Sequence, residues 1–233
     1  MVKLTQLGNN STFQLHELLA KYRSVGVAQG IRVNFSDIPK DYWAKDYIAE
    51  LAAMEIIDGY PDGTFRPNAP VTRAQLAALL QKTFIKSKVR KAINFRDVPP
   101  DYWAYNAIRE SYEMGFFTVV NSRNFNPTQK LKRLDVLITL AKGLNYKFSG
   151  STKDILSIYN DAYTIRSEHR EFIAALTENG VIVNYPNVKL LNGDKQATRA
   201  EVSALLYRSM VSAGETADFA SKYTVKPVRK GER

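Results

Sequence analysis

The sequence contains no cysteine and only two histidines, His16 and His169, among its 233 residues. The absence of cysteine excludes disulfides, thiolate metal sites and cysteine nucleophiles. Two histidines are too few for a multi-histidine metal site. A chain without cysteine is compatible with an oxidising compartment. The sequence therefore predicts no thiol chemistry and no metal site.

Long hydrophobic runs are also missing. No segment approaches the roughly 18 consecutive apolar residues that a membrane span requires. Residues 1–10 are polar and lack the basic-then-apolar pattern of a signal peptide. We therefore expect no membrane span, and both an exported protein and one that stays in the cytoplasm remain open.

Recognisable catalytic motifs are absent as well. The chain has no Gly-x-Ser-x-Gly sequence and no glycine loop that would cradle phosphate. No spacing singles out a catalytic pair of carboxylates. Asp58, Asp62 and Gly63 resemble part of a calcium loop, but the glutamate of loop position 12 is missing. We expect neither an enzyme nor a cofactor.

Positive charge is abundant: 33 lysines and arginines against 23 acidic residues give a net charge of +10. Such an excess favours an anionic partner, which could be nucleic acid, an acidic polysaccharide or anionic lipid. Nucleic acid is disfavoured because the aromatic residues alternate with core positions and no DNA-reading motif is present. Residues 82–94 carry five basic residues and no acid, which fits either a solvated linker or a patch that contacts an acidic polymer.

An internal repeat begins at Phe35. The segments 35–39 (FSDIP) and 41–44 (DYWA) return sixty residues later as 95–99 (FRDVP) and 101–104 (DYWA). A third, weaker copy opens at Tyr159 and lacks the tryptophan. We predict repeats at residues 33–92, 93–156 and 157–213 within one structural domain, preceded by a lead-in helix over 1–32 and followed by a basic tail over 214–233.

Each repeat reads as a first helix, a loop rich in glycine, proline, aspartate and asparagine, a short extended piece and a second helix. The first helix is expected to begin at Asp41 or Asp101. One such unit cannot bury its apolar faces alone, whereas three can share a core. The predicted fold is all-α, with three helix–loop–helix units in a pseudo-threefold arrangement around a shared helical core.

An arginine recurs in the first turn of each predicted second helix. A threonine before it and a glutamine or glutamate three residues later form a capping box in two of the three copies. A cation in a first turn is unfavourable by about 0.3–1 kcal/mol, so we expect a carboxylate or phosphate to dock on the free N–H groups beside it. The alternative is an ion pair with the chain's own Asp37 or Asp58. We call this sequence the arginine motif; its copies are Thr72-Arg73-Ala74-Gln75, Lys132-Arg133-Leu134-Asp135 and Thr198-Arg199-Ala200-Glu201.

In order, the motifs Phe-x-Asp-hydrophobic, Trp-Ala, Asp-Gly-Tyr-x-Asp-Gly-x-Phe-x-Pro and Thr-Arg-Ala-Glu/Gln resemble the S-layer homology domain family over residues 35 to 211. The segments 183–188 and 197–201 resemble the last unit of cyanobacterial members. The resemblance implies binding to a secondary cell-wall polysaccharide linked to peptidoglycan, often through a pyruvate ketal. It also implies a place in the cell envelope.

The resemblance further implies which residues contact the polysaccharide in grooves between neighbouring units. The anion contacts would be Arg73, Arg133 and Arg199. Trp43 and Trp103 would shape the grooves or else pack in the core, and the other contributors would be Asp37, Asp97, Asp58 and Gly59. The second arginine motif lacks a hydroxyl cap and the third unit lacks tryptophan. Unequal grooves are therefore expected, with those of Arg73 and Arg199 favoured.

Two functions follow from these patterns. The first is a non-catalytic module that anchors a protein to the cell wall by binding an anionic polysaccharide. The second is a protein-interaction scaffold that keeps the fold, has a degenerate sugar site and docks an acidic protein on its basic surface.

Overall fold

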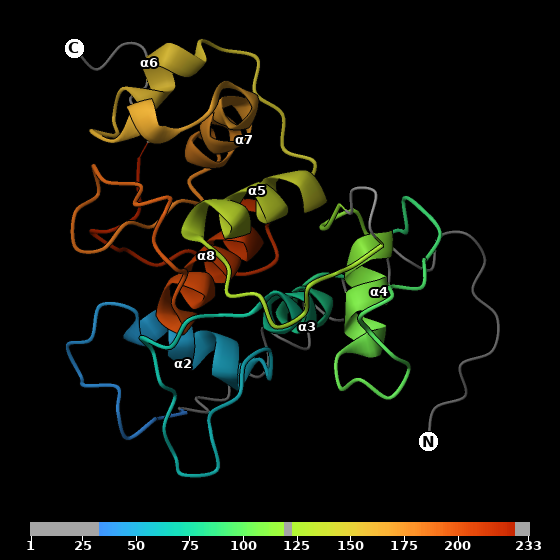
Figure 1. Ribbon diagram of the computed structural model, residues 1–233. Helices are drawn as coiled ribbons and strands as arrows, with labels where there is room; N and C mark the ends of the chain where they lie inside the picture. Colours follow the sequence, from blue (N-terminus) through green and yellow to red (C-terminus); the bar gives the residue numbers. More distant parts are fainter. Residues whose placement is uncertain (1–32, 119–122, 227–233) are drawn as a thin grey trace, which may run out of the picture.

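The structure, a computed structural model, describes residues 33–118 and 123–226 (Figure 1). The lead-in helix predicted over 1–32 lies outside this range, as do residues 119–122 and the end of the basic tail. Within the described ranges the regular structure is helical, and β pairing is limited to isolated bridges. The prediction of an all-α fold is confirmed.

Each predicted unit contributes a first and a second helix. The second helices, which begin at the arginine motifs, are α3 (Arg73–Thr83), α5 (Arg133–Gly143) and α8 (Arg199–Ser212). The first helices are α2 (Lys45–Ala53), α4 (Tyr105–Glu113) and α7 (Ser167–Glu178). A short helix, α6 (Thr152–Leu156), and a 3-10 turn, η1 (Ala162–Thr164), precede α7.

The first helices begin later than expected. α2 starts at Lys45 rather than at Asp41, because the amides of Tyr42 and Lys45 close successive turns on the carbonyls of Pro39 and Tyr42. The same turns precede α4 at Tyr105. Both tryptophans therefore lie in the turn before a helix and not on its face.

The capping boxes predicted for two helices are present. At α3 the Thr72 hydroxyl accepts from the Gln75 amide at 3.3 Å, and the Gln75 side chain accepts from the Thr72 amide at 2.9 Å. Thr198 and Glu201 repeat this at α8, at 3.2 and 2.9 Å. At α5 the Asp135 carboxylate accepts from the Lys132 amide at 3.1 Å, but an ammonium group cannot accept the reciprocal bond. One of the first N–H groups of α5 thus lacks the side-chain acceptor that threonine gives the other two helices.

The main helix packing crosses from one unit to the next. α3 packs against α4, α5 against α7, and α8 against α2. Isolated bridges join the segments ahead of the three second helices in pairs: Thr72 with Lys130, Lys132 with Gln196, and Pro70 with Thr198. The contacts therefore form a closed ring, and the threefold symmetry of that ring stays a prediction. We call the α3/α4, α5/α7 and α8/α2 contacts the first, second and third junctions.

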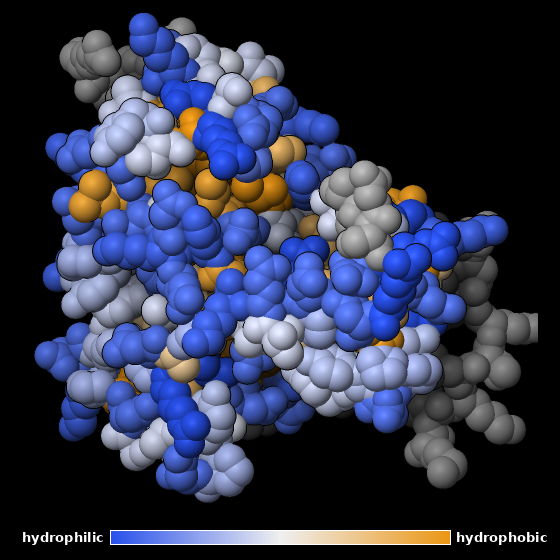
Figure 2. Space-filling model, viewed as in Figure 1, coloured by the Kyte–Doolittle hydropathy of each residue, from blue (hydrophilic) through white to orange (hydrophobic). Residues whose placement is uncertain are grey.

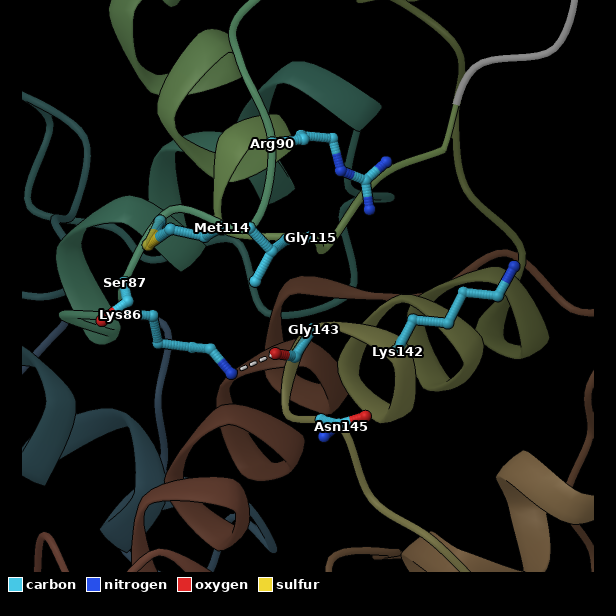
Figure 3. Close-up of a pocket in the computed structure, with 9 residues that line it drawn as sticks. Lys86, Ser87, Arg90, Met114, Gly115, Lys142, Gly143 and Asn145 are labelled. Carbon is cyan, nitrogen blue, oxygen red and sulfur yellow. Dashed lines mark hydrogen bonds between the residues drawn. The ribbon is translucent and has the colours of Figure 1, made fainter.

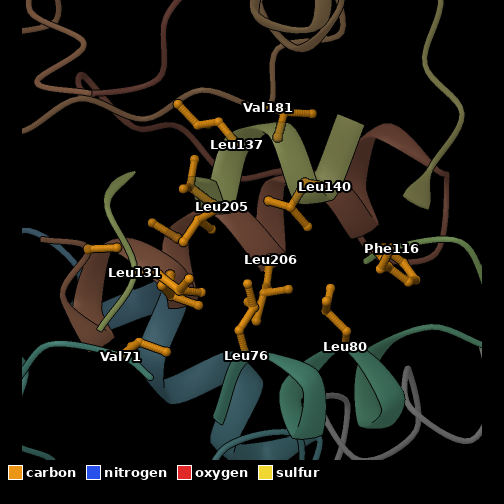
Figure 4. Close-up of a cluster of buried hydrophobic side chains, with 14 of the residues drawn as sticks. Val71, Leu76, Leu80, Phe116, Leu131, Leu137, Leu140, Val181, Leu205 and Leu206 are labelled. Carbon is orange, nitrogen blue, oxygen red and sulfur yellow. The ribbon is translucent and has the colours of Figure 1, made fainter. Parts of the chain in front are cut away.

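The second helices share one hydrophobic core. Their apolar side chains meet at the centre of the molecule, where α5 also packs against α8 (Figure 4). Full burial of one such side chain contributes about 1.5–3 kcal/mol. Six leucines of this core are fully buried: Leu76, Leu80, Leu137, Leu140, Leu205 and Leu206.

The face of the molecule seen in Figure 2 is mostly hydrophilic, and hydrophobic side chains reach it only in small patches between the elements. Among the residues that the structure describes, no helix combines the length and apolar character needed to cross a membrane. The core is thus enclosed by polar residues on this face.

Candidate ligand-binding site

The backbone N–H groups at the three helix starts are already occupied. The amides of Arg73 and Ala74 donate to the carbonyls of Gln129 and Pro127, both at 2.9 Å. The corresponding amides of α5 donate to Lys195 and Gly193, and those of α8 to Ala69 and Pro67, at 2.8 to 3.0 Å. Each helix start is therefore docked on the loop of the following unit. The expectation that an anion would bind these N–H groups is not what the structure shows.

Arg133 lies wholly inside the protein, with 2% of its surface exposed. Its Nε donates to the Leu191 carbonyl at 2.8 Å, and its Nη2 donates to the Val183 carbonyl at 2.5 Å and the Asn184 side chain at 2.7 Å. Burial lowers the pKa of this guanidinium, and the Glu201 carboxylate, 3.5 Å from Nη1, opposes that effect. Arg133 thus links α5 to the third loop and to α8, and it presents no donor to solvent.

Arg199 is only half-buried. Its Nε and Nη2 donate to the carbonyls of Phe65 and Asp58, both at 2.8 Å. The guanidinium lies over the Phe65 ring, 4.3 Å from the ring centroid, and burial lowers its pKa. The Asp58 carboxylate pairs instead with Lys82 at 2.8 Å. Arg199 therefore contacts the backbone of the first unit, and within the described ranges no carboxylate lies at ion-pair distance from it.

Arg73 occupies the matching place at the first junction. Its Nη2 donates to the Thr118 carbonyl at 3.3 Å, and its guanidinium lies 4.8 Å from the ring centroids of Phe117 and Phe125. Its Nε is buried and has no partner among the residues that the structure describes. Burial is the main cause that lowers the pKa of Arg73. Of the three arginines, it has the fewest of its donors engaged by the described residues.

Asp37 and Asp97 each hold a turn of the backbone. The two oxygens of Asp37 accept from the amides of Phe65 and Arg66, both at 2.7 Å. The same contact recurs at Asp97 with residues 125 and 126, and at Asp161 with residues 191 and 192. The second residue of each pair has a positive φ, between 53° and 57°. These carboxylates fix the approach to each second helix, and Asp161 extends the pattern to the third unit.

Gly59 permits a close contact that no other residue would allow. A Cβ atom there would lie 2.3 Å from the ring of Phe35. The glycine thus lets the backbone pack against the Phe35 ring directly after Asp58, whose carbonyl accepts a hydrogen bond from Arg199. Its observed role is in packing.

The two tryptophans occupy different surroundings. Trp43 stacks on Tyr185 with ring centroids 5.0 Å apart and planes inclined by 8°, and Tyr223 meets it edge-on at 6.2 Å. Trp103 is 64% exposed and contacts Tyr102 at 5.9 Å. Sequence reasoning did not select Tyr185 as a site residue, although its loop supplied part of the family resemblance. Trp43 therefore joins two units, whereas Trp103 is free to meet a ligand.

A hollow of about 620 Å³ lies in the second unit beside the start of α3. It brings together Asp97, Tyr102 and three polar side chains. The carbonyls of Pro127 and Gln129, which accept the first amides of α3, belong to the same wall. Aromatic rings with nearby amide, hydroxyl and carboxylate groups suit a polyol with one apolar face. We call this the first-junction hollow; its lining is Asp97, Tyr102, Asn126, Pro127, Thr128 and Gln129.

Comparison with characterised proteins gives several relatives. The chain is 28% identical to an amylopullulanase of Thermoanaerobacterium thermosulfurigenes over 77% of the chain and 10% of the relative. It is 36% identical to a cellulosome-anchoring protein of Acetivibrio thermocellus over 41% of the chain and 21% of the relative. It is 27% identical to a surface-layer 125 kDa protein of Lysinibacillus sphaericus over 75% and 14%. The chain thus covers only a small part of each of these proteins.

The S-layer homology domain model matches the chain at residues 34–77 and 94–137. Both segments run from the opening Phe-x-Asp sequence to the helix that follows the arginine motif, so they contain Asp37 and Asp97, Trp43 and Trp103, and the first-junction hollow. These two segments of the chain are therefore S-layer homology domains.

Proposed function

We propose that this chain is a non-catalytic module that attaches to the cell wall by binding an anionic polysaccharide linked to peptidoglycan. The observation that carries the proposal is the first-junction hollow, in which Tyr102 lies with three hydrogen-bonding side chains. The Tyr102 ring also lies 5.9 Å from the ring of Trp103, which is exposed. The two S-layer homology domains and the similarity to a cellulosome-anchoring protein support the proposal. We place the module in the cell envelope.

The anion would be recognised by a guanidinium that the fold leaves partly unengaged. Arg73 adjoins the first-junction hollow through its own helix start, and Arg199 lies at the third junction together with Trp43 and Asp58. A planar guanidinium matches a carboxylate such as that of a pyruvate ketal. Arg133 is enclosed by backbone acceptors. We therefore assign ligand contacts to the first and third junctions and a structural role to the second.

The third unit belongs to the same proposal. The contacts of Asp161 and of the Thr198 capping box repeat those of the two matched segments. We infer a third repeat that completes the third junction by bringing Tyr185 onto Trp43.

A binding assay on purified cell walls tests this function. We expect the chain to sediment with walls that retain their polysaccharide and to stay in solution with walls from which it has been removed. Tyr102→Ala combined with Trp103→Ala should weaken binding by about tenfold or more, since aromatic residues in a binding site are frequent hot spots. Tyr163→Ala, at a tyrosine that is 85% exposed, is the matched control and should bind normally.

Two results would contradict the proposal. Equal binding to stripped walls would favour the protein-interaction scaffold that docks an acidic partner. Unchanged binding by the Tyr102 and Trp103 variant would remove the first-junction hollow from the recognition site. Far-ultraviolet circular dichroism of each variant separates a lost contact from a lost fold.

A further inference from the structure

A second concave region lies at the opposite ends of the second helices. Two adjoining hollows of about 560 and 240 Å³ lie where the segment after α3 meets the ends of α4 and α5 (Figure 3). They share four lining residues: Arg90, Gly115, Lys142 and Asn145. We call the two together the basic hollow, because its four charged lining residues are Lys86, Arg90, Lys142 and Lys147.

The charge of the basic hollow has one sign only. None of the residues that line the two hollows is acidic. Lys142 and Lys147 are exposed, while Lys86 and Arg90 are half-buried. Burial lowers the pKa of Lys86, and the negative charge of Glu215 only partly opposes this effect. Four cations around one concave surface repel one another, so an anion placed between them would be stabilised.

Helix capping explains only one of these cations. The Lys86 ammonium donates to the Gly143 carbonyl at the end of α5 (Figure 3), as expected for a cation at a helix C-terminus. Arg90 makes only weak contacts. Its Nη1 donates to the Phe117 carbonyl over a long distance of 3.4 Å, and its guanidinium lies 4.9 Å from the centroid of the Tyr112 ring. The Lys142 side chain extends away from the end of α5 (Figure 3), and its ammonium lies 5.4 Å from the centroid of the Phe172 ring. Arg90 and Lys142 therefore retain N–H groups that can donate hydrogen bonds to a ligand.

The surroundings favour a charged sugar or polyol chain over a single small ion. Lys86 lines one of the two adjoining hollows, Lys147 lines the other, and Arg90 and Lys142 line both. The cations can therefore meet successive charges of a polymer. Asn145 and Ser87 add polar groups to the lining. Val89, which is 66% exposed, and Phe172 add apolar edges against which sugar carbons can pack.

We propose that the basic hollow is a second anion-binding site, which takes phosphate or carboxylate groups carried by a sugar or polyol chain. It lies beside the C-terminal ends of α3 and α5, whereas the first-junction hollow lies beside the start of α3. Thr118, which lines the basic hollow, also accepts a hydrogen bond from the Arg73 side chain. A polymer bound at the first-junction hollow could therefore be held at two separate points. The inference rests on the proposed function in taking a wall polymer as the natural ligand, but the site can be tested without walls.

The test measures binding of three soluble, fluorescently labelled oligomers to the full chain: a glycerol phosphate oligomer, an oligogalacturonate and an uncharged dextran. We expect one or both charged oligomers to bind and the dextran not to bind. Whichever charged oligomer binds more tightly identifies phosphate or carboxylate as the source of the anion. Lys142→Gln combined with Lys147→Gln should weaken that binding by about tenfold at low salt, from about threefold to fivefold for each exposed ion pair lost.

The matched control removes the same charge elsewhere. Lys153→Gln combined with Lys195→Gln changes two exposed lysines that do not line the basic hollow. An equal loss in the two double variants would show that only the net charge matters, and this would overturn the proposal, as would binding of dextran as strong as that of the charged oligomers.

The failures of the two proposals can be told apart. Tyr102→Ala with Trp103→Ala leaves the basic hollow intact, so that variant should bind the charged oligomer normally. Oligomer binding that depends on Lys142 and Lys147, together with no retention by cell walls, would refute the anchoring function alone. Wall retention without any dependence on the two lysines would refute the second site alone.

Discussion

Three arginines in equivalent sequence positions reach different degrees of enclosure. Arg133 is 2% exposed, whereas Arg73 and Arg199 remain half-buried. The difference arises from the loop of the following unit, because the third loop surrounds Arg133 with the acceptors of residues 183, 184 and 191. The sequence predicts that each arginine lies in the first turn of its helix. It does not predict the burial of Arg133, because that burial depends on contacts between residues about fifty positions apart.

The burial of Arg133 leads to a prediction about stability. Arg133→Met should lower the free energy of unfolding by about 3–5 kcal/mol, because it leaves the Glu201 carboxylate and two buried carbonyls without their donor. Urea denaturation followed by circular dichroism would measure the loss.

Arg73→Met is the comparison variant, since it removes one described hydrogen bond, of 3.3 Å. It should cost about 0.5–1.5 kcal/mol. Equal losses in the two variants would contradict the structural role assigned to Arg133.

The helix starts show how far local sequence rules reach. The threonine and glutamine or glutamate of two arginine motifs form the expected capping boxes. Helices α2 and α4 begin later than Asp41 and Asp101, the residues at which the sequence predicts their starts. Aspartate can cap a helix, but here a pair of turns precedes each helix. Hydrogen bonds between neighbours in sequence can be anticipated, whereas the docking of Arg73 and Ala74 amides on the next unit requires the folded chain.

The incomplete cap of α5 can be repaired. Lys132→Thr should raise the free energy of unfolding by about 0.5–1 kcal/mol, because the hydroxyl can accept the Asp135 amide as Thr72 and Thr198 accept theirs. The ion pair between Lys132 and Asp194 would also be lost, but both side chains are exposed, so solvent screening makes this loss small.

The chemical denaturation midpoint of Lys132→Thr would measure the balance. Lys132→Ala removes the same ion pair without supplying a hydroxyl, so it isolates that loss. If the threonine variant is no more stable than the alanine variant, the missing cap is not a weakness of α5.

The whole molecule is held together by helix pairs that belong to different units. The repeat in the sequence predicted an all-α fold and a shared core, because its apolar positions recur at helical spacing. Periodicity defines the apolar face of a helix but not the helix that will cover it. That α3 packs on α4, and α8 on α2, therefore emerges only in three dimensions.

This cross-packing predicts that no unit is stable alone. A fragment of residues 33–92 retains α2 and α3 but lacks α8 and α4, their principal partners. It should be largely unfolded by circular dichroism, whereas residues 33–226 should unfold in one cooperative transition in urea. A folded fragment, or separate transitions in the longer chain, would show that the units are energetically independent.

The third junction has a consequence for how proteins of this kind can change in length. Since α8 returns to α2 and Arg199 bonds to the carbonyl of Phe65, the last segment fills the place beside the first. An open solenoid can grow by duplicating one module, because its terminal surface accepts another copy. Here a duplicated module would find no vacant surface, so larger assemblies would have to be made by joining complete rings through linkers.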